Sequence, residues 1–255
     1  MLLRRVIEHV KAQNWTAVAI DFVIVVVGVF VGLQLGNWNE ARLQRNTERE
    51  FLVQLRDDIA DSVRVLESQS RYVNDVVAGG RRGLAFLKGE SDCIRECEAL
   101  LVDLFHASQV WGTPYDYTKY QEAKRLGFPS NPVVAAKMQE FYSYLNGWDT
   151  VNGAAPRYRE RIRSYITPEA AELLWTGCMR LPGSEIEELT RDCIDDLKAL
   201  GVEDMLRDIR ADPELAKELQ FWLGQNIFAL TGYPDMIRYA DAASMAIAAE
   251  LGVAP

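Results

Sequence analysis

Four cysteines are the residues of this sequence that are best suited to chemistry. Cys93 and Cys97 are separated by three residues, and Cys178 and Cys193 by fourteen. An even number of cysteines in an exported domain favours disulfides, and proximity in the chain pairs Cys93 with Cys97 and Cys178 with Cys193. Two alternatives stay open: the cysteines are buried free thiols, or all four bind zinc, although the paired C-x2-C spacing of common zinc sites is missing.

Other catalytic residue types are sparse. A His-dependent triad would need His106, since the only other histidine is His9, and His106 lies between core-like residues in LFHASQVW. No G-x-S-x-G, H-E-x-x-H, EF-hand or Walker A motif is present in the sequence. We therefore expect no catalytic residues, no bound cofactor, no metal site and no enzymatic activity.

Aromatic and charged clusters are the remaining candidates for binding. Tyr and Trp are enriched at interaction hot spots, so one aromatic group is a candidate interaction surface, or else it fills a helical core. The acidic clusters either hold a cation or form a solvated face, and the basic run 157–163 contacts lipid headgroups or is an exposed helix face. The aromatic candidates are Trp111, Tyr115, Tyr117 and Tyr120, and the acidic clusters are Glu185, Glu187, Glu188 and Asp192, Asp195, Asp196.

The first element that positions these residues is an apolar segment near the N-terminus. Residues 17–35 read AVAIDFVIVVVGVFVGLQL, and Trp15 and Trp38 flank them as membrane-interface anchors. As a helix this run covers about 28 Å, close to the roughly 30 Å hydrocarbon core of a bilayer. A buried core helix or a cleaved signal peptide fits a run of this length less well. We predict a transmembrane helix at 15–38, after a cytoplasmic or interfacial segment at 1–14.

One face of this predicted helix has the features of a helix-packing surface. Gly28, Gly32 and Gly36 recur every four residues, a spacing that lets helix backbones approach closely in lipid. At 100° per residue, Asp21 falls on the same face, and a carboxylate in a span usually faces protein. Alternatively, Asp21 reaches the headgroups or stays protonated. The expected partners are the lipid bilayer and a helix from a second copy or another membrane protein.

The orientation of the chain follows from the two flanks and the cysteines. Arg4, Arg5 and Lys11 precede the span, whereas the basic residues after it are mixed with many acids. This charge difference alone is a weak signal. A short N-terminal segment in the cytoplasm and an exported domain with disulfides are mutually consistent, so we predict a single-pass protein of a bacterial inner membrane with a periplasmic C-terminal domain.

Residues 39–255 are predicted to form an all-α domain. They contain 25 basic and 35 acidic residues, and an acidic surface disfavours nucleic-acid binding. Apolar residues recur at helical spacing throughout, whereas strand-like alternation is nearly absent. Gly79-Gly80-Arg81-Arg82-Gly83 predicts a turn after a long first helix, and Thr167-Pro168 and Asp212-Pro213 predict helix starts. The later helices are expected at about 93–107, 113–127, 131–147, 154–175, 184–200, 202–210, 213–230 and 234–251.

The membrane exit DFVIVVVGVFVGLQLGNWNEARL resembles an uncharacterised family of bacterial single-span membrane proteins, a domain of unknown function. The family shows an acidic residue, an apolar run and a Leu-Gln-x-x-Asn-Trp-Asn-Glu motif, which falls here on Leu33, Gln34, Asn37, Trp38, Asn39 and Glu40. Weaker similarity covers TPYDYTKYQEAKRLGF and the segment that begins DPELAKELQFWL. The resemblance implies a membrane protein with a helical domain and implies no activity.

Three functions are compatible with these features. The first is a membrane-anchored helical interaction or scaffold protein. The second is an accessory subunit of a larger membrane complex, of respiratory or photosynthetic type. The third is a ligand sensor or enzyme whose site leaves no motif. Co-purification of fixed membrane subunits would favour the second, and a bound small molecule would favour the third.

Overall fold

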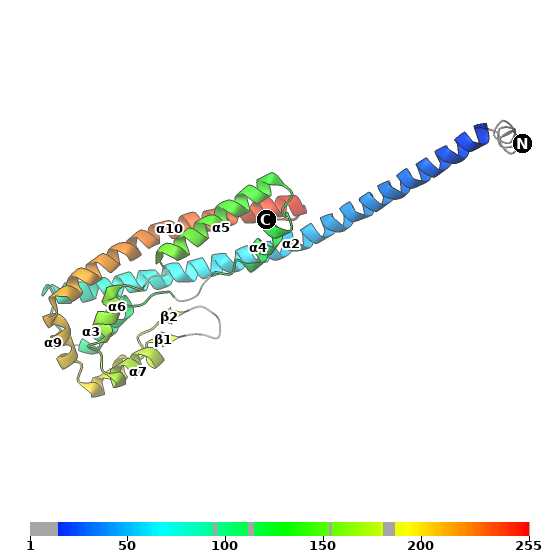
Figure 1. The fold of residues 1–255 in the computed structure, drawn as a ribbon. Coiled ribbons are helices and arrows are strands. Elements are labelled where there is room, and N and C mark those ends of the chain that lie inside the picture. Colours follow the sequence, from blue (N-terminus) through cyan, green and yellow to red (C-terminus); the bar gives the residue numbers. More distant parts are fainter. Residues whose placement is uncertain (1–14, 94–95, 112–114, 153–154, 181–186, 255) are drawn as a thin grey trace, which may run out of the picture. The chain divides into compact units, whose positions relative to one another are not determined.

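The computed structural model describes residues 15–93, 96–111, 115–152, 155–180 and 187–254, with backbone alone at residues 15–19, 21 and 148–152 (Figure 1). Its elements are overwhelmingly helical, which confirms the predicted all-α class. The strands β1 (Met179–Arg180) and β2 (Glu188–Leu189) form a two-residue antiparallel ladder in which Met179 pairs with Leu189 and Arg180 with Glu188. The chain divides into two compact units, residues 1–50 and 51–255.

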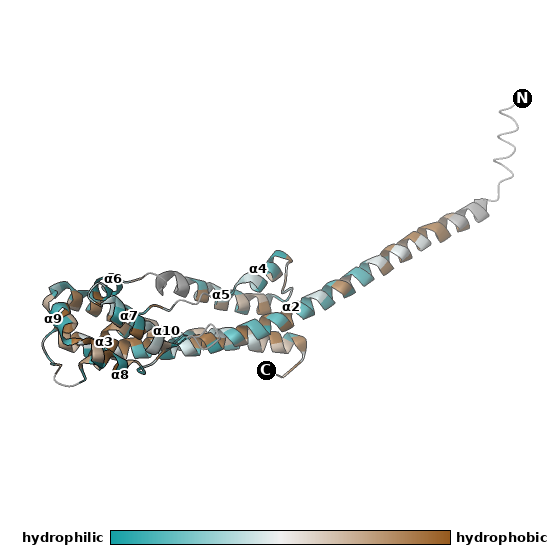
Figure 2. Cartoon of the chain, turned by 90° about the horizontal axis from the view of Figure 1, so that it is seen from below, coloured by the Kyte–Doolittle hydropathy of each residue, from teal (hydrophilic) through white to brown (hydrophobic). Residues whose placement is uncertain are grey.

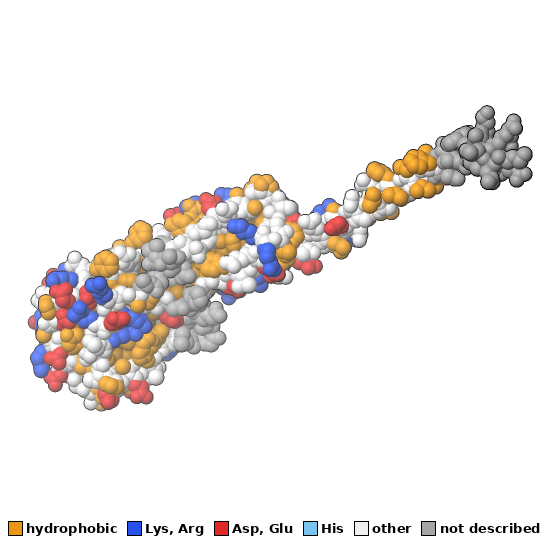
Figure 3. All heavy atoms as spheres, in the orientation of Figure 1, with side chains coloured by type: hydrophobic (Ala, Val, Ile, Leu, Met, Phe, Trp, Pro, Cys, Tyr) orange, Lys and Arg blue, Asp and Glu red, His pale blue; other side chains and the backbone are white. Residues whose placement is uncertain are grey.

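The first unit contains the beginning of helix α2 (Trp15–Leu87). This stretch contains a helical run that is long and apolar enough to cross a membrane, and none of that run is buried. Its large apolar side chains from Phe22 to Leu35 are 48–68% exposed, so hydrophobic atoms cover this part of α2 (Figure 3). Figure 2 shows the same hydrophobic residues along the helix. An apolar surface of this size requires lipid or protein around it.

The second unit is built on three long helices. These are α2 from Phe51 onward, α5 (Pro132–Asn152) and α10 (Pro213–Leu251). Helix α10 packs along α5 (Figure 1), and Asn131 donates a 2.6 Å hydrogen bond to Glu250. Apolar residues at helical spacing face the core between them, for example Leu55, Ile59 and Leu66 on α2.

Most of the short helices lie at one end of the long ones, whereas the short helix Thr118–Arg125 lies near the other end (Figure 1). Helix α3 is held by two side chains of other helices: the Tyr158 hydroxyl donates to the Leu104 carbonyl at 3.0 Å, and the Trp222 indole to the Ala107 carbonyl at 2.9 Å. The short helices are α3 (Cys97–Ala107), α4 (Thr118–Arg125), α6 (Arg157–Arg163), α7 (Pro168–Gly177), α8 (Ile194–Leu197), the 3-10 helix η1 (Lys198–Leu200) and α9 (Glu203–Ala211).

The turn predicted at residues 79–83 is wrong, because α2 continues through these glycines to Leu87. They serve close packing. A Cβ on Gly80 would collide with the Leu223 side chain of α10, and one on Gly83 would lie 2.8 Å from Leu104 of α3. Small residues are therefore needed where α3 and α10 approach α2.

Further boundaries differ from the sequence prediction. The helix predicted at 154–175 is divided into α6 (Arg157–Arg163) and α7 (Pro168–Gly177), and the one predicted at 113–127 begins, within the described residues, at Thr118. The expected break before residue 234 is absent, and Pro234 lies inside α10, exposed on its surface. The predicted helix at 184–200 is replaced, within the described residues, by β2, α8 and η1. The predicted helix starts are confirmed: Thr167 Oγ1 accepts the Ala170 N–H at 3.3 Å, and Asp212 Oδ1 accepts the Glu214 N–H at 2.9 Å.

Candidate functional site

A group of ionisable side chains surrounds Asp103 of α3. This carboxylate is buried, yet it receives two hydrogen bonds from Arg82 of α2, at 2.6 Å from Nε and 2.7 Å from Nη2. Arg191, which follows β2, pairs with the same carboxylate. Charge-assisted, bidentate contacts of this kind fix geometry as well as charge. Asp103 thereby joins α2, α3 and the segment after β2.

A cavity of about 470 Å³ opens beside this ion-pair cluster. Its walls are formed by α2 with Asp75 and Arg82, by His106 of α3 and by the Thr190–Asp192 segment. Burial raises the pKa of Asp75, and the nearby charges of Arg191 and Arg82 act against that shift. The cavity thus presents cationic and anionic groups together, a lining suited to a small dipolar molecule or a peptide segment.

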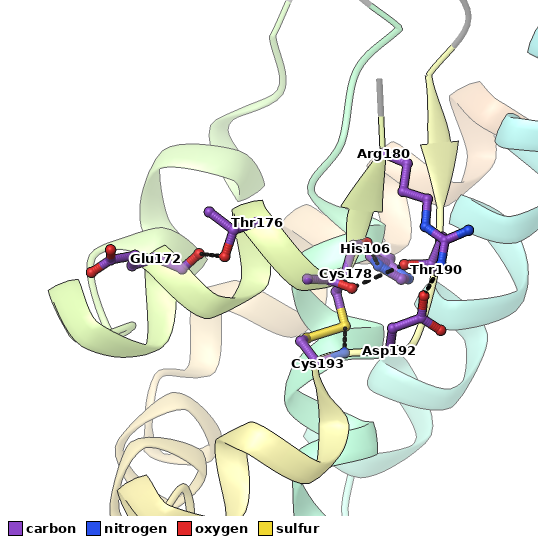
Figure 4. Close-up of a disulfide and its surroundings, with 9 residues drawn as sticks. His106, Glu172, Thr176, Cys178, Arg180, Thr190, Asp192 and Cys193 are labelled. Carbon is purple, nitrogen blue, oxygen red and sulfur yellow. Dashed lines mark hydrogen bonds and ion pairs between the residues drawn. A yellow bond between two sulfur atoms is a disulfide. The ribbon is translucent and has the colours of Figure 1, made fainter. Parts of the chain in front are cut away.

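The hairpin that forms one wall is fastened by the buried Cys178–Cys193 disulfide (Figure 4). The Cys193 N–H donates to Cys178 Sγ at 3.3 Å, and the Thr190 hydroxyl donates to the Gly177 carbonyl at 3.1 Å. Outside them, Arg180 pairs with Asp192 across the hairpin. The ladder between β1 and β2 is only two residues long. The disulfide and these polar contacts therefore hold Thr190–Asp192 in place against α3.

His106 is part of this wall, and its chemistry is restricted. Its Nε2 lies 2.9 Å from the Cys178 carbonyl (Figure 4), and because a carbonyl only accepts, Nε2 donates. Burial lowers the pKa of His106, so the ring is neutral near pH 7. A histidine whose Nε2 proton is committed to a backbone carbonyl serves the hairpin, as the core-like sequence around it indicates.

A smaller cavity of about 210 Å³ continues from the first along α2. Tyr72, Asp75 and Glu187 line it. Burial, and next the negative charge of Glu187, raise the pKa of Tyr72, while burial raises that of Glu187. Tyr72 and Glu187 interact with each other, but within the described residues neither the Tyr72 hydroxyl nor Glu187 Oε2 makes a hydrogen bond of regular geometry. Buried polar atoms in this state are the usual positions of bound water or a polar ligand group.

Two arginines of α6 approach the same region from the other side. Arg163 donates to Ser108 Oγ and Gln109 Oε1, both at 3.0 Å, and Arg159 donates to the Ser108 carbonyl at 2.9 Å. Burial, and next the charge of Arg159, lower the pKa of Arg163 to about 10. Arg159 and Arg163 of the basic run therefore bind other parts of the domain, so the run is not only an exposed helix face.

The four aromatic candidates pack against the domain core. Tyr115 is buried and donates to Gln69, and Trp111 lies edge-on to Tyr72 with ring centroids 5.3 Å apart. Tyr120 stacks on Tyr142 at 4.1 Å, and Tyr117 meets the same ring edge-on at 6.2 Å. Of the two alternatives, an interaction surface or part of a helical core, their packing agrees with the second.

The other predicted positions are distributed over both units. Both expected disulfides, Cys93–Cys97 and Cys178–Cys193, are formed. A Cβ on Gly28, Gly32 or Gly36 would meet no described atom within 4 Å, and Trp38 is exposed. The side chains of Trp15 and Asp21, and residues 1–14, lie outside the described part of the structure.

Sequence reasoning missed Asp103, its two arginines and the cavity beside them. One signal was available: Asp103 interrupts the apolar run LLVDLFHA, and a carboxylate inside a core helix needs a cationic partner. The sequence around Arg82 and around Arg191 contains no pattern that identifies either residue as the partner of Asp103. Among the described residues, no group of three or more His, Cys, Asp or Glu side chains is arranged to hold a metal ion.

The fold and the site together define an all-α protein that has, among its described residues, one candidate membrane span and a polar cavity walled by α2, α3 and a disulfide-fastened hairpin. Comparison of the chain with protein-family models, with curated proteins and with solved structures finds no match.

Proposed function

We propose that this protein is a membrane-anchored helical interaction protein that works by binding rather than by catalysis. One observation carries the proposal: an apolar, wholly exposed helical run in residues 1–50 belongs to the same chain as a domain with its own well-buried core. The run suits a bilayer, and the polar cavities of 470 and 210 Å³ in the domain suit a partner segment or small polar molecule.

The proposed location is a bacterial inner membrane, with the N-terminus in the cytoplasm and the domain in the periplasm. Two disulfides support an oxidising compartment for the domain. The Leu33–Glu40 membrane-exit motif supports membership of the single-span family that it resembles.

Protease accessibility tests the orientation. A tag placed at the C-terminus should be lost when protease is added to intact spheroplasts, while a cytoplasmic marker survives. Protection of the tag until the membrane is lysed would place the domain in the cytoplasm and overturn the proposed location.

A second role, as an accessory subunit of a larger membrane complex, is favoured by the glycine face of the span. Gly28, Gly32 and Gly36 have open space at their Cβ positions, and together with Asp21 they offer a surface for another helix. Gly28→Ile with Gly32→Ile should abolish such a contact without preventing insertion. Val23→Ile with Val27→Ile is the control, because at 100° per residue these two positions fall on the opposite side of the same helix from the glycines.

Native-gel size and the set of co-purifying membrane proteins are the readouts for both pairs of variants. A fixed set of subunits that is lost only with the glycine pair selects the accessory role, and loss of self-association alone selects the interaction protein. If neither readout changes, the glycines are incidental and the helix is only an anchor.

A further inference from the structure

We propose that Cys93–Cys97 is an exchangeable disulfide that captures thiols, and that Cys178–Cys193 is a permanent one. This inference is independent of the proposed function and adds a covalent reaction to the domain. The partner is a thiol, supplied either by a small molecule such as glutathione or by a cysteine of a peptide.

The two disulfides differ in access. Both sulfurs of the Cys178–Cys193 bridge belong to residues with no exposed surface, in the core behind the hairpin. Cys93 is partly exposed and Cys97 is 9% exposed. Because thiol–disulfide exchange requires a thiolate to reach a sulfur atom, this difference alone separates the two bridges kinetically.

A cavity of about 460 Å³ gives an incoming thiol a place to bind beside Cys93 and Cys97. Phe86 and Leu206 form an apolar floor, and Arg210, which lies 4.9 Å over the Phe86 ring, pairs with Asp92 at 2.5 Å. Arg207 and Glu203 also line the cavity. The volume is sufficient for a cysteine side chain with its neighbouring backbone, or for a small thiol.

The position of Cys97 makes it the better leaving group. It is the first residue of α3, an 11-residue helix, and Glu96 before it provides no side-chain cap. The unpaired N–H groups at a helix N-terminus stabilise a nearby thiolate and lower its pKa. Cys93, the more exposed of the two, is the sulfur that an incoming thiolate can reach.

The reaction has two balanced steps. The partner thiolate attacks Cys93 Sγ, a new disulfide forms between them, the bond to Cys97 breaks, and Cys97 keeps the electron pair as a thiolate. A second thiolate, from another glutathione molecule or from the other thiol of a dithiol partner, then attacks the partner sulfur of this mixed disulfide. The partner leaves as a disulfide, having lost two electrons, and Cys93 leaves as a thiolate that takes a proton from water. Oxidised glutathione reverses both steps and restores the Cys93–Cys97 bond.

Graded reduction of the full-length protein in detergent, without denaturant, tests the proposal. After incubation with reduced glutathione, free thiols are alkylated and assigned by peptide mapping. Cys93 and Cys97 should become alkylatable at least about tenfold faster than Cys178 and Cys193, which are the internal control. Equal rates for all four cysteines, or reduction of Cys93–Cys97 only in denaturant, would overturn the proposal.

Two single variants test the assigned roles. Cys97→Ser should form a mixed disulfide at Cys93 with oxidised glutathione. In Cys93→Ser, the pH dependence of alkylation should place the pKa of Cys97 below the ordinary thiol value of about 8.5. A Cys97 pKa at or above that value would contradict its role as leaving group. In both variants, resistance of the Cys178–Cys193 bridge to reduction without denaturant reports that the domain is folded, because the folded core buries these two residues.

The source of the thiol is decided by offering Cys97→Ser two probes separately, oxidised glutathione and a model protein whose thiols are activated as mixed disulfides. An adduct with glutathione alone identifies a small-molecule thiol as the partner, and an adduct with the protein identifies a peptide thiol. An adduct with neither would overturn the proposal.

Discussion

Asp103 is the residue on which the arrangement of the cavity walls depends. Its buried carboxylate pairs with both Arg82 and Arg191, whose side chains are 52% and 42% exposed. The partly hydrated arginines can recover some water contacts if the carboxylate is lost, so the cost is smaller than for a fully buried pair.

We expect Asp103→Asn to lower the free energy of unfolding by about 1–3 kcal/mol, as for hydrogen bonds to charged groups. Asp61→Asn is the matched control, because Asp61 pairs with Arg64 on the exposed surface of α2, where a pair contributes at most about 1 kcal/mol. Denaturant unfolding measures both. Equal effects of the two substitutions would mean that Asp103 does not organise the site.

His106 predicts a pH dependence of stability. Burial lowers its folded pKa below the unfolded value of about 6.5. Between the two values the unfolded chain binds more protons than the folded one. The stability that neutral His106 contributes is therefore complete above about pH 6.5 and is lost as the pH falls towards the folded pKa.

His106→Gln, which retains a donor for the Cys178 carbonyl, should lose less thermal stability than the wild type between about pH 7.5 and pH 5.5. Asp75 and Glu187, whose pKa values burial raises, act in the opposite direction at lower pH and are common to both proteins. The comparison therefore isolates His106. Parallel melting-temperature curves for the two proteins would show that its ionisation is not coupled to folding.

At the scale of the elements, glycine is required for close helix packing at one position of this domain and is not required at another. Gly80 of α2 has the Leu223 side chain of α10 where its Cβ would lie, whereas Gly224 of α10 has no atom within 4 Å of that position. Gly80→Val should destabilise the domain by about 1–3 kcal/mol through overpacking. Gly224→Val should leave stability roughly unchanged or raise it slightly. Thermal melts measure both, and a similar loss in both variants would show that the contact between Gly80 and Leu223 does not set the cost.

Pro234 provides the complementary test inside a helix. It is exposed within α10, so its removal takes no side chain from the core and restores a backbone donor. Pro234→Ala should raise the free energy of unfolding by about 1–3 kcal/mol. A loss of stability measured by denaturant unfolding would show instead that α10 needs the bend that proline imposes.

These two elements also explain where sequence reasoning failed. Glycine and proline are read locally as breaks, but at Gly79–Gly83 and Pro234 the packing of long helices outweighs that local preference. Thr167 and Asp212 were predicted correctly as helix caps because a cap depends on neighbours two or three residues away. The Asp103 cluster joins residues 21 and 88 positions apart, and no local pattern encodes such a pairing.

At the scale of the whole molecule, the exposed apolar run of α2 predicts membrane attachment. Val26→Arg with Val29→Arg places two charges in the run, at about 2.5–3.5 kcal/mol each near the bilayer centre, and should release the protein into the soluble fraction after alkaline extraction. Leu43→Arg is the control, because Leu43 is equally apolar and 58% exposed but lies beyond the run. Retention of the double variant in membranes would show that residues 20–35 are not the anchor.

The contact between Gly80 of α2 and Leu223 of α10 has a consequence for how the protein is made. The domain core is shared between the first and last helices of residues 51–255, so the apolar face of α2 stays uncovered until α10 has been synthesised. In the proposed orientation, the N-terminal part of the domain enters the periplasm before α10 does. During that time the apolar face of α2 would be exposed, and exposed apolar surface promotes aggregation. Its biogenesis should therefore depend on periplasmic chaperones that bind unfolded chains and prevent their aggregation. Any truncation that removes α10 should yield a protein that is degraded although its membrane helix is intact.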